Sequence, residues 1–222
     1  KIKPADSRYK RGNKGGQVIQ GAGIIDVSTI GEHVEPGGDL GQIWGNSGND
    51  TIKGFNSDNF RDTITGNAGN DLIDGMAGDD LLYGGSGNNT LIGGKGDDKL
   101  RGDAGDDRLI GGTGSDQFIF LYSANNGTDQ IVDFEIGIDK ILIANTKIEV
   151  GFSDLLISDG EAGAEIIIGD MTHVQVLGVS ADQLSASDFL FDINLMSAAR
   201  RNRPTCRPVW QPAAAIRPGS GP

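Results

Sequence analysis

The sequence predicts an all-β protein in which short strands stack into a solenoid and a β-rich cap closes its carboxyl-terminal end. The first observation is a nine-residue pattern over residues 45–120, with glycine first, an acidic residue sixth and a large apolar residue eighth. The second is the distribution of the 36 glycines, which concentrate at this period instead of scattering as in low-complexity sequence. The third is the change after residue 120, where glycine thins out and strand-like apolar runs follow.

Eight copies of the repeat follow one another, and each supplies one strand and one turn. They begin at Gly45, Gly54, Gly66, Gly75, Gly84, Gly93, Gly102 and Gly111, and the second copy is stretched to twelve residues. The eighth positions are Ile52, Ile64, Ile73, Leu82, Leu91, Leu100, Leu109 and Phe118. In a strand around that position, alternation turns the apolar side chain inward, while the glycine-rich first six residues turn the chain with positive φ angles. Two repeats therefore complete an 18-residue coil, and eight repeats give four coils stacked about 4.8 Å apart.

The sixth position lies in the turn and is acidic in every copy but one. These residues are Asp50, Asp62, Asp71, Asp80, Asn89, Asp98, Asp107 and Asp116. Turns on one side come from every second repeat, so carboxylates of alternate copies stack about 5 Å apart and repel by roughly 3 kcal/mol at an effective dielectric of 20. Burial of one Leu or Ile contributes only about 2 kcal/mol. A hard divalent cation resolves the repulsion by taking carboxylate and carbonyl oxygens, and calcium suits flexible, carbonyl-rich loops better than magnesium does.

The array resembles the G-G-x-G-x-D-x-U-x repeat of RTX (repeats-in-toxin) proteins. The resemblance implies a right-handed parallel β-roll in which calcium ions lie between same-side loops, held by sixth-position side chains and by loop carbonyls. The fourth-position glycines among these carbonyl ligands are Gly48, Gly69, Gly78, Gly87, Gly96, Gly105 and Gly114. The same-side pairs, which allow up to six ions, are Asp50/Asp71, Asp71/Asn89, Asn89/Asp107, Asp62/Asp80, Asp80/Asp98 and Asp98/Asp116. The two pairs that contain the neutral Asn89 are expected to be weakest among the full-length repeats, and Asp62 lies in the stretched copy, which departs from the pattern.

The segments on either side of the array are expected to cap it. Residues 1–44 form a basic leader in which Val18-Ile19 and Ile24-Ile25 predict short capping strands. Residues 121–191 form the β-rich cap, with strands predicted at 130–134, 140–144, 165–168 and 174–177 and a helical turn that begins at Ser180. A cap is required because the last coil would otherwise expose an open sheet edge.

The cap sequence resembles a segment that follows the β-roll in secreted metalloproteases and related RTX proteins. The matching residues are 127–134 (GTDQIVDF) and 137–141 (GIDKI). Asp129, Asp133 and Asp139 either hold one further ion or serve as turn and solvent-facing residues. Residues 185–191 (SASDFLF) are similar to the carboxyl-terminal end of such proteins, which implies a secreted, extracellular protein exported by type I secretion with an uncleaved signal. Residues 192–222, rich in Arg, Pro and Ala, are expected to be a basic disordered tail.

Charge and composition exclude several classes of protein. The net charge is −12, but residues 1–16 carry +5 and residues 192–222 carry +4, so residues 17–191 carry −21. Such an acidic segment repels nucleic acid and anionic lipid, and cations are its natural partners. No stretch reaches the length of a transmembrane helix, and the first sixteen residues lack the apolar run of a signal peptide. The lone Cys206 allows no internal disulfide, so an extracellular fold must be stabilised otherwise, for example by metal.

The sequence shows no catalytic motif, and the chain is expected to be no enzyme. Its two histidines, His33 and His173, lie outside any His-Glu-x-x-His zinc motif, and no Gly-x-Ser-x-Gly elbow occurs. We expect a calcium-binding module that folds on calcium binding outside the cell and supports an upstream domain of the same parent chain. Because the first residue is Lys1, we expect a piece of a longer secreted enzyme, toxin or adhesin. A polysaccharide-binding module and an adhesin segment or structural spacer remain as alternatives.

Overall fold

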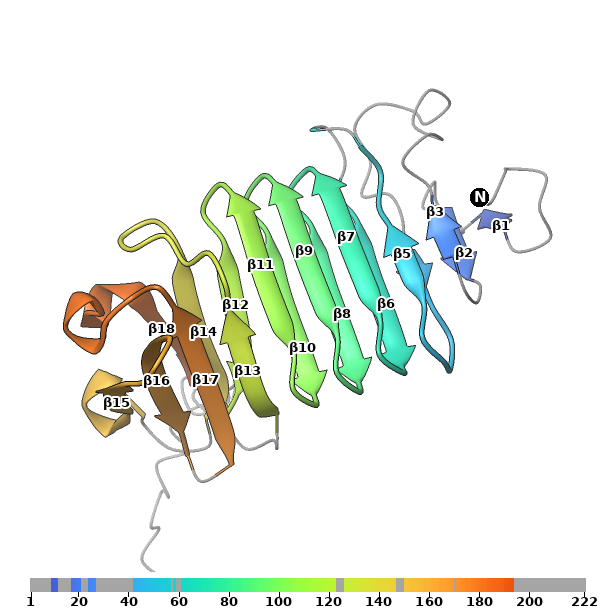
Figure 1. Ribbon diagram of the computed structural model, residues 1–222. Helices are drawn as coiled ribbons and strands as arrows, with labels where there is room; N and C mark the ends of the chain where they lie inside the picture. Colours follow the sequence, from blue (N-terminus) through green and yellow to red (C-terminus); the bar gives the residue numbers. More distant parts are fainter. Residues whose placement is uncertain are drawn as a thin grey trace, which may run out of the picture.

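The array folds into two facing sheets, and successive strands of the chain fall in opposite sheets (Figure 1). The computed structural model describes residues 9–11, 17–20, 24–26, 42–56, 58, 61–122, 126–146, 150–169 and 171–193. In this part of the chain each sheet has nine strands, in the orders β1-β2-β4-β6-β8-β10-β12-β14-β18 and β15-β16-β17-β13-β11-β9-β7-β5-β3. The strands of the array pair in parallel within each sheet. The protein is therefore a parallel β-roll, as predicted.

Most strands of the array are longer than the sequence predicts. One sheet contains β4 (Gln42–Trp44), β6 (Thr63–Ala68), β8 (Leu81–Ser86), β10 (Lys99–Ala104) and β12 (Gln117–Leu121). The other contains β5 (Thr51–Lys53), β7 (Leu72–Ala77), β9 (Thr90–Lys95) and β11 (Arg108–Thr113). A six-residue strand covers positions seven to nine of one repeat and one to three of the next, whereas three residues around position eight were expected. The turn is therefore limited to positions four to six.

Neighbouring strands of a sheet are offset by one coil. Leu82 of β8 pairs with Leu100 of β10, and Leu91 of β9 pairs with Leu109 of β11. The offset of 18 residues stacks equal repeat positions on one another and confirms two repeats per coil. The stretched copy does not break the stacking, because Ile52 of β5 still pairs with Ile73 of β7.

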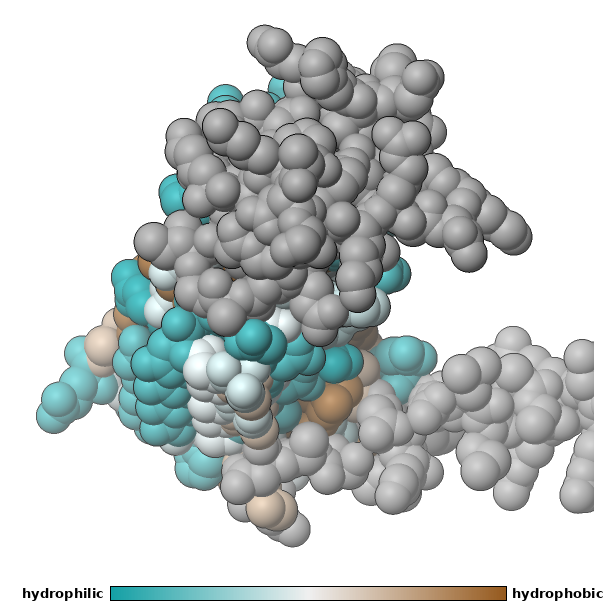
Figure 2. All heavy atoms as spheres, turned by 90° about the vertical axis from the view of Figure 1, so that its right-hand side faces the viewer, coloured by the Kyte–Doolittle hydropathy of each residue, from teal (hydrophilic) through white to brown (hydrophobic). Residues whose placement is uncertain are grey.

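The eighth positions form the core between the two sheets. All eight side chains, from Ile52 to Phe118, have 0% exposure. Each such burial contributes about 2 kcal/mol, and the stacked eighth positions continue into the cap through Ile131, which pairs with Leu109, and Ile141, which pairs with Phe118. Outside the core, the surface in the end-on view from the side of β1–β3 is mainly hydrophilic, and teal residues form stacked rows along the array (Figure 2).

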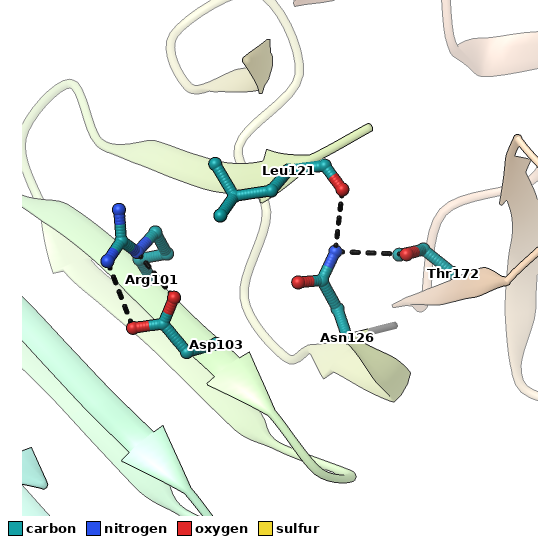
Figure 3. A network of polar contacts seen from close by, with 5 residues as sticks. All are labelled: Arg101, Asp103, Leu121, Asn126 and Thr172. Atoms are coloured by element: carbon teal, nitrogen blue, oxygen red, sulfur yellow. Dashed lines mark hydrogen bonds and ion pairs between the residues drawn. The ribbon is translucent and has the colours of Figure 1, made fainter. Parts of the chain in front are cut away.

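Two repeat positions adopt left-handed backbone. The fourth-position glycines have φ between 111° at Gly87 and 134° at Gly114. Second positions with positive φ are Gly85, Gly94 and Gly112, and also the non-glycine residues Asn67, Met76 and Asp103. At Asp103 the conformation is supported by an ion pair, since its Oδ1 lies 2.8 Å from Arg101 Nε and its Oδ2 accepts from Nη2 at 3.1 Å (Figure 3).

Gly94→Ala should destabilise the β-roll by about 2 kcal/mol. At φ 116° a Cβ is unfavourable, and it would overlap the carbonyl oxygen of Met76 in the neighbouring coil. The thermal unfolding midpoint, measured in one buffer for both proteins, should fall. Lys95→Ala, at the exposed next residue, is the control and should leave the midpoint within the error of the wild type. An unchanged midpoint for Gly94→Ala would contradict the stacking described above.

Three further strands precede β4. They are β1 (Tyr9–Arg11), β2 (Gln17–Gln20) and β3 (Ile24–Asp26). β2 pairs in parallel with β4 and β3 with β5, so the strands predicted around Val18 and Ile24 extend both sheets by one rung. Most of the leader, including His33, lies outside the described residues.

The cap continues both sheets and then folds back on one of them. Its strands are β13 (Gly127–Ile131), β14 (Lys140–Thr146), β15 (Leu156–Asp159), β16 (Gly163–Ile168), β17 (Thr172–Leu177) and β18 (Phe189–Ile193). β13, β14, β17 and β18 continue the parallel pairing, whereas β16 and β15 add antiparallel. Residues 194–222, and with them Cys206 and nearly all of the predicted tail, lie outside the described residues.

Two cap predictions are corrected by the structure. The strand predicted at 130–134 lies at 127–131, because Asp133 turns back and accepts hydrogen bonds from the backbone N–H groups of Gly111 (2.9 Å) and Gly112 (3.0 Å). Strands β15 and β18 were not predicted. β18 shows that the segment likened to a secretion-signal end also pairs with β14 and closes that sheet.

In the part of the chain that the structure describes, helical structure is limited to short 3-10 turns. They are η2 (Phe152–Asp154), η3 (Ala181–Gln183) and η4 (Ala186–Asp188). η3 is the predicted helical turn, and the side chain of Gln183 accepts a hydrogen bond from Ser180 N at 2.9 Å. Among the described residues, no helix is both long and apolar enough to span a membrane.

Buried polar and aromatic contacts join the cap to the last coil. Asn126 Nδ2 donates to the carbonyl oxygen of Leu121 at the end of β12 (3.1 Å) and to Thr172 Oγ1 at the start of β17 (2.9 Å; Figure 3). The rings of Phe118 and Phe134 lie 6.1 Å apart. The array core is therefore continuous with the cap core.

Candidate metal centre

The sixth-position side chains form two buried columns, one along each row of turns. All eight residues from Asp50 to Asp116 are at most 3% exposed. In each column the backbone N–H of one rung donates to the side-chain Oδ1 of the next rung, at 2.7–2.9 Å. One column contains Asp50, Asp71, Asn89 and Asp107, and the other contains Asp62, Asp80, Asp98 and Asp116. The structure thus brings together the same-side sets that the period implies.

The second oxygen of most of these carboxylates has no hydrogen-bond partner. Unpartnered buried oxygens are Oδ2 of Asp71, Asp80, Asp98, Asp107 and Asp116, and Oδ1 of Asp62. At the amino-terminal end of the columns, Asp50 Oδ2 accepts from Asn46 N at 3.0 Å and Asp62 Oδ2 from Phe55 N at 2.6 Å. A buried polar atom without a partner is costly and rare, and a whole column of them indicates an absent positive partner.

The unpartnered oxygens face glycine backbone. A Cβ on Gly75 would lie 2.5 Å from Asp80 Oδ2 and 2.7 Å from the carbonyl oxygen of Gly93 in the next coil. The same arrangement of a carboxylate Oδ2 and a next-coil glycine carbonyl, here called a cradle, occurs at Gly45, Gly54, Gly66 and Gly93. At Gly84 the side-chain atom is Asn89 Nδ2, and at Gly102 and Gly111 the three nearest atoms belong to Asp107 and Asp116. A carboxylate oxygen and a carbonyl oxygen from adjacent rungs therefore border one small space. This donor set suits a hard, oxygen-seeking cation.

The fourth-position glycines lie in the turns between these rungs. Their carbonyl oxygens stack closely, since a Cβ on Gly87, Gly96 or Gly105 would overlap the carbonyl of the fourth-position glycine one coil earlier. The predicted glycines thus present a row of backbone oxygens beside the carboxylates. The described residues contain no group of three or more His, Cys, Asp or Glu side chains arranged to hold a metal, because each cradle combines a single carboxylate with backbone oxygens.

Burial raises the pKa of six carboxyls in the columns, those of Asp62, Asp71, Asp80, Asp98, Asp107 and Asp116. Desolvation brings the pKa of Asp80 to about 9 and the pKa values of Asp62 and Asp98 to about 7, although backbone N–H donors oppose the rise. For Asp80, the charges of Asp62 and Asp98 in the same column add to the rise. The pKa values of Asp107 and Asp116 rise to about 6 through desolvation. The ionised columns are therefore unfavourable without a counter-charge.

A second pair of columns, at the fifth position, was missed by the sequence analysis. The Oδ1 atoms of Asn70, Asp79 and Asp97 accept from the backbone N–H of the fifth position in the following coil, at 2.8–2.9 Å. These bonds run opposite to those of the sixth position, where the following rung supplies the acceptor. The recurrence of Asn or Asp at this position is the signal that identifies these columns from sequence.

The cap carboxylates Asp129 and Asp139 extend the two columns by one rung. Asp107 N donates to Asp129 Oδ1 and Asp116 N to Asp139 Oδ1, both at 2.9 Å. Asp129 and Asp139 are 1% and 2% exposed, so they are not solvent-facing. Asp139 Oδ2 accepts from Glu135 N at 2.8 Å, so it closes a turn.

His173 is the histidine that lies within the described residues, and it belongs to neither carboxylate column. It is exposed on β17, opposite Ile167 of β16. No catalytic partner was predicted for it, and it takes no part in the candidate site.

The fold and the stacked acidic turns define a parallel β-roll that offers carboxylate and carbonyl oxygens to a cation. The family model of the RTX calcium-binding nonapeptide repeat matches in four copies, over residues 41–60, 57–91 and 83–118. Residues 41–118 therefore carry RTX calcium-binding repeats, and the array is a calcium-binding β-roll module.

Two solved structures are similar to the chain. The extracellular lipase LipA from Serratia marcescens has 17% identity and a TM-score of 0.32, over 78% of this chain and 42% of the lipase chain. The AlgE6R3 subunit of the Azotobacter vinelandii mannuronan C5-epimerase has 21% identity and a TM-score of 0.30, over 85% of this chain and 95% of that subunit. The chain thus spans less than half of the lipase. No curated protein sequence matches it significantly.

Proposed function

We propose that the chain is a non-catalytic module that couples calcium binding to folding and thereby stabilises an upstream domain of a secreted protein. The observation that carries the proposal is the set of buried carboxylate oxygens without partners, three of which, Oδ2 of Asp71, Asp80 and Asp98, lie beside a glycine carbonyl of the next coil. A bound calcium ion supplies the positive charge that these oxygens lack. Residues 45–120 serve as the binding array, and residues 121–191 cover its last coil.

The cradles of Asp71, Asp80 and Asp98 are the best-formed ligand sets. In each, an unpartnered Oδ2 borders the carbonyl oxygen of a first-position glycine from the next coil. The fourth-position glycines add carbonyl oxygens from the turn. Such sets are flexible and rich in carbonyls, which favours calcium over the smaller magnesium ion with its strict octahedral shell. The pairing of rungs sets the upper limit of six ions in the array.

Because calcium concentration differs between the two sides of the cell envelope, the coupling of calcium binding to folding makes the chain fold on the outer side only. At low cytosolic calcium the chain remains unfolded and fit for export, and millimolar calcium outside drives folding by mass action. The sequence has a single cysteine and therefore no internal disulfide, so metal binding is the available way to stabilise an extracellular fold. This supports an extracellular location. The likeness of residues 185–191 to a carboxyl-terminal signal supports type I secretion.

Asp98→Asn should raise the calcium midpoint of folding roughly tenfold, which corresponds to about 1.4 kcal/mol for one lost ligand charge. The substitution keeps the Oδ1 that accepts from Asp80 N and removes the charge of the cradle. Asp116→Asn should have a smaller effect, because Asp116 belongs to one same-side pair of the array whereas Asp98 belongs to two. Calcium titrations followed by circular dichroism measure both midpoints.

Asp97→Asn is the matched control for this experiment. Asp97 is the exposed neighbour of Asp98, and an asparagine keeps the Oδ1 that accepts from Ser115 N. Its calcium midpoint should stay within about twofold of the wild type, as expected for a screened surface charge. Equal midpoints for all three variants and the wild type would rule out the columns as the calcium site.

A further inference from the structure

Asn89 occupies the same place in its column as the aspartates. It is 2% exposed, its Oδ1 accepts from Asp71 N at 2.9 Å, and its own N–H donates to Asp107 Oδ1 at 2.7 Å. The backbone and the Oδ1 of Asn89 therefore make the same hydrogen bonds as those of the aspartates in the column. Any difference in what the rung binds must come from the second side-chain atom.

That second atom is a donor, and it already has a partner. Asn89 Nδ2 donates to the carbonyl oxygen of Gly87, the fourth-position glycine of the same turn, at 2.9 Å. A Cβ on Gly84 would lie 2.6 Å from this Nδ2 and 2.5 Å from the carbonyl oxygen of Gly102, so Nδ2 fills the place of the carboxylate oxygen in the other cradles. At Asp71, Asp80 and Asp98 the atom in this place is an oxygen without any donor.

We propose that the Asn89 rung closes its turn with its own amide and binds no calcium ion, so that the Asn89/Asp107 pair is an ion-free joint within the array. This inference rests on the proposed calcium-binding function. The amide N–H dipole supplies the positive end that an ion supplies at the other rungs. The array then holds at most five ions, one fewer than the pairing of rungs allows.

Turning the amide over does not restore a site. With the oxygen in the cradle, the NH2 group would face the backbone N–H of Asp71, which now donates to Oδ1, and the bond to Gly87 would be lost. With a cation in the cradle, either orientation of the Asn89 amide leaves one donor or acceptor without a partner. Without a cation, only the observed orientation gives both the Oδ1 and the Nδ2 of Asn89 a partner. The Asp71/Asn89 pair is unaffected, because its cradle carries the Oδ2 of Asp71 and the carbonyl of Gly84.

The charges of the two columns agree with this assignment. The Asn89 column is interrupted by a neutral rung, and the backbone N–H of Asn89 donates to Asp107 Oδ1 at 2.7 Å. In the uninterrupted column, Asp80 lies between the carboxylates of Asp62 and Asp98. The joint therefore relieves repulsion in one column only.

The experiment counts calcium ions per chain by native mass spectrometry and by calorimetric titration at saturating calcium. Asn89→Asp should gain one ion relative to the wild type, because it places a carboxylate oxygen in a complete cradle. Asp98→Asn should lose one, because it copies the Asn89 rung into the other column. Asn88→Asp is the matched control: it adds the same charge at the exposed neighbouring residue, keeps the Oδ1 that accepts from Asp106 N, and should leave the count unchanged.

An unchanged count in Asn89→Asp, with circular dichroism showing a folded protein, would overturn the inference. So would an unchanged count in Asp98→Asn, which keeps the test decisive if Asn89→Asp does not fold. A gain in Asn88→Asp equal to that in Asn89→Asp would also overturn it, since it would show a general charge effect. A wild-type chain that takes up no calcium would instead refute the proposed function itself.

Discussion

Removal of calcium should abolish most of the β structure of this chain. Without a cation, the Oδ2 atoms of Asp71, Asp80 and Asp98 stay buried without a partner, and each ionised group costs more than one core side chain contributes. The cost recurs at every acidic rung, because the columns stack carboxylates coil upon coil. The array should therefore fold only when ion binding offsets this cost.

Far-ultraviolet circular dichroism of the chain in chelator and in millimolar calcium measures this effect. The β signal should appear only with calcium, and magnesium at the same concentration is the control that should restore little of it. Equal β content in chelator and in calcium would contradict the coupling of binding and folding.

In the calcium-free protein, folded structure should become less stable as pH rises from about 4 to about 9. The pKa of Asp80 is 3.8 in the unfolded chain and about 9 in the fold, through desolvation, and those of Asp62 and Asp98 rise to about 7. Between these values the folded state binds more protons than the unfolded state, so the free energy of unfolding falls with rising pH. Calcium reverses the sign, because its ligands must be deprotonated and its affinity therefore increases with pH.

The folded fraction of metal-stripped protein across this pH range, measured by far-ultraviolet circular dichroism, tests the prediction. Asp80→Asn is the control variant, because it removes the carboxyl with the highest of these pKa values while keeping the oxygen that accepts from Asp62 N. Its stability should depend less on pH than that of the wild type. A calcium-free protein that gains stability between pH 5 and pH 8 would contradict the burial of ionised columns.

The period of the sequence was enough to predict the β-roll, its core and its same-side columns. Nine residues with an apolar eighth position leave one arrangement in which all eight side chains point inward, and the structure buries each of them completely. The cap was predicted only in part. β15 and β18 have exposed apolar residues, Leu156 and Leu190, and their apolar pattern is short, so their place as edge strands depends on tertiary pairing.

Other features could not be read from the repeat because they depend on contacts between coils. Met76 and Asp103 adopt left-handed backbone at the second repeat position, where three other copies have glycine, since the stacked neighbours fix that conformation. The amide of Asn89 was expected to contribute a neutral carbonyl ligand, but its nitrogen faces Gly87. The hydrogen bonds of the preceding coil decide whether the oxygen or the nitrogen of such an amide enters the cradle. The sequence of a single repeat does not reveal these bonds.

The stacking of equal positions also determines which changes of length the protein tolerates. Successive rungs of a column are separated by 18 residues in the regular coils but by 21, 22 and 23 residues elsewhere, and the backbone bonds between rungs are kept. Extra residues loop out without shifting the register. Loss of a single nonapeptide is different, because it would transfer every later strand to the opposite sheet and exchange the two rows of turns. Arrays of this kind should therefore lengthen or shorten by whole pairs of repeats.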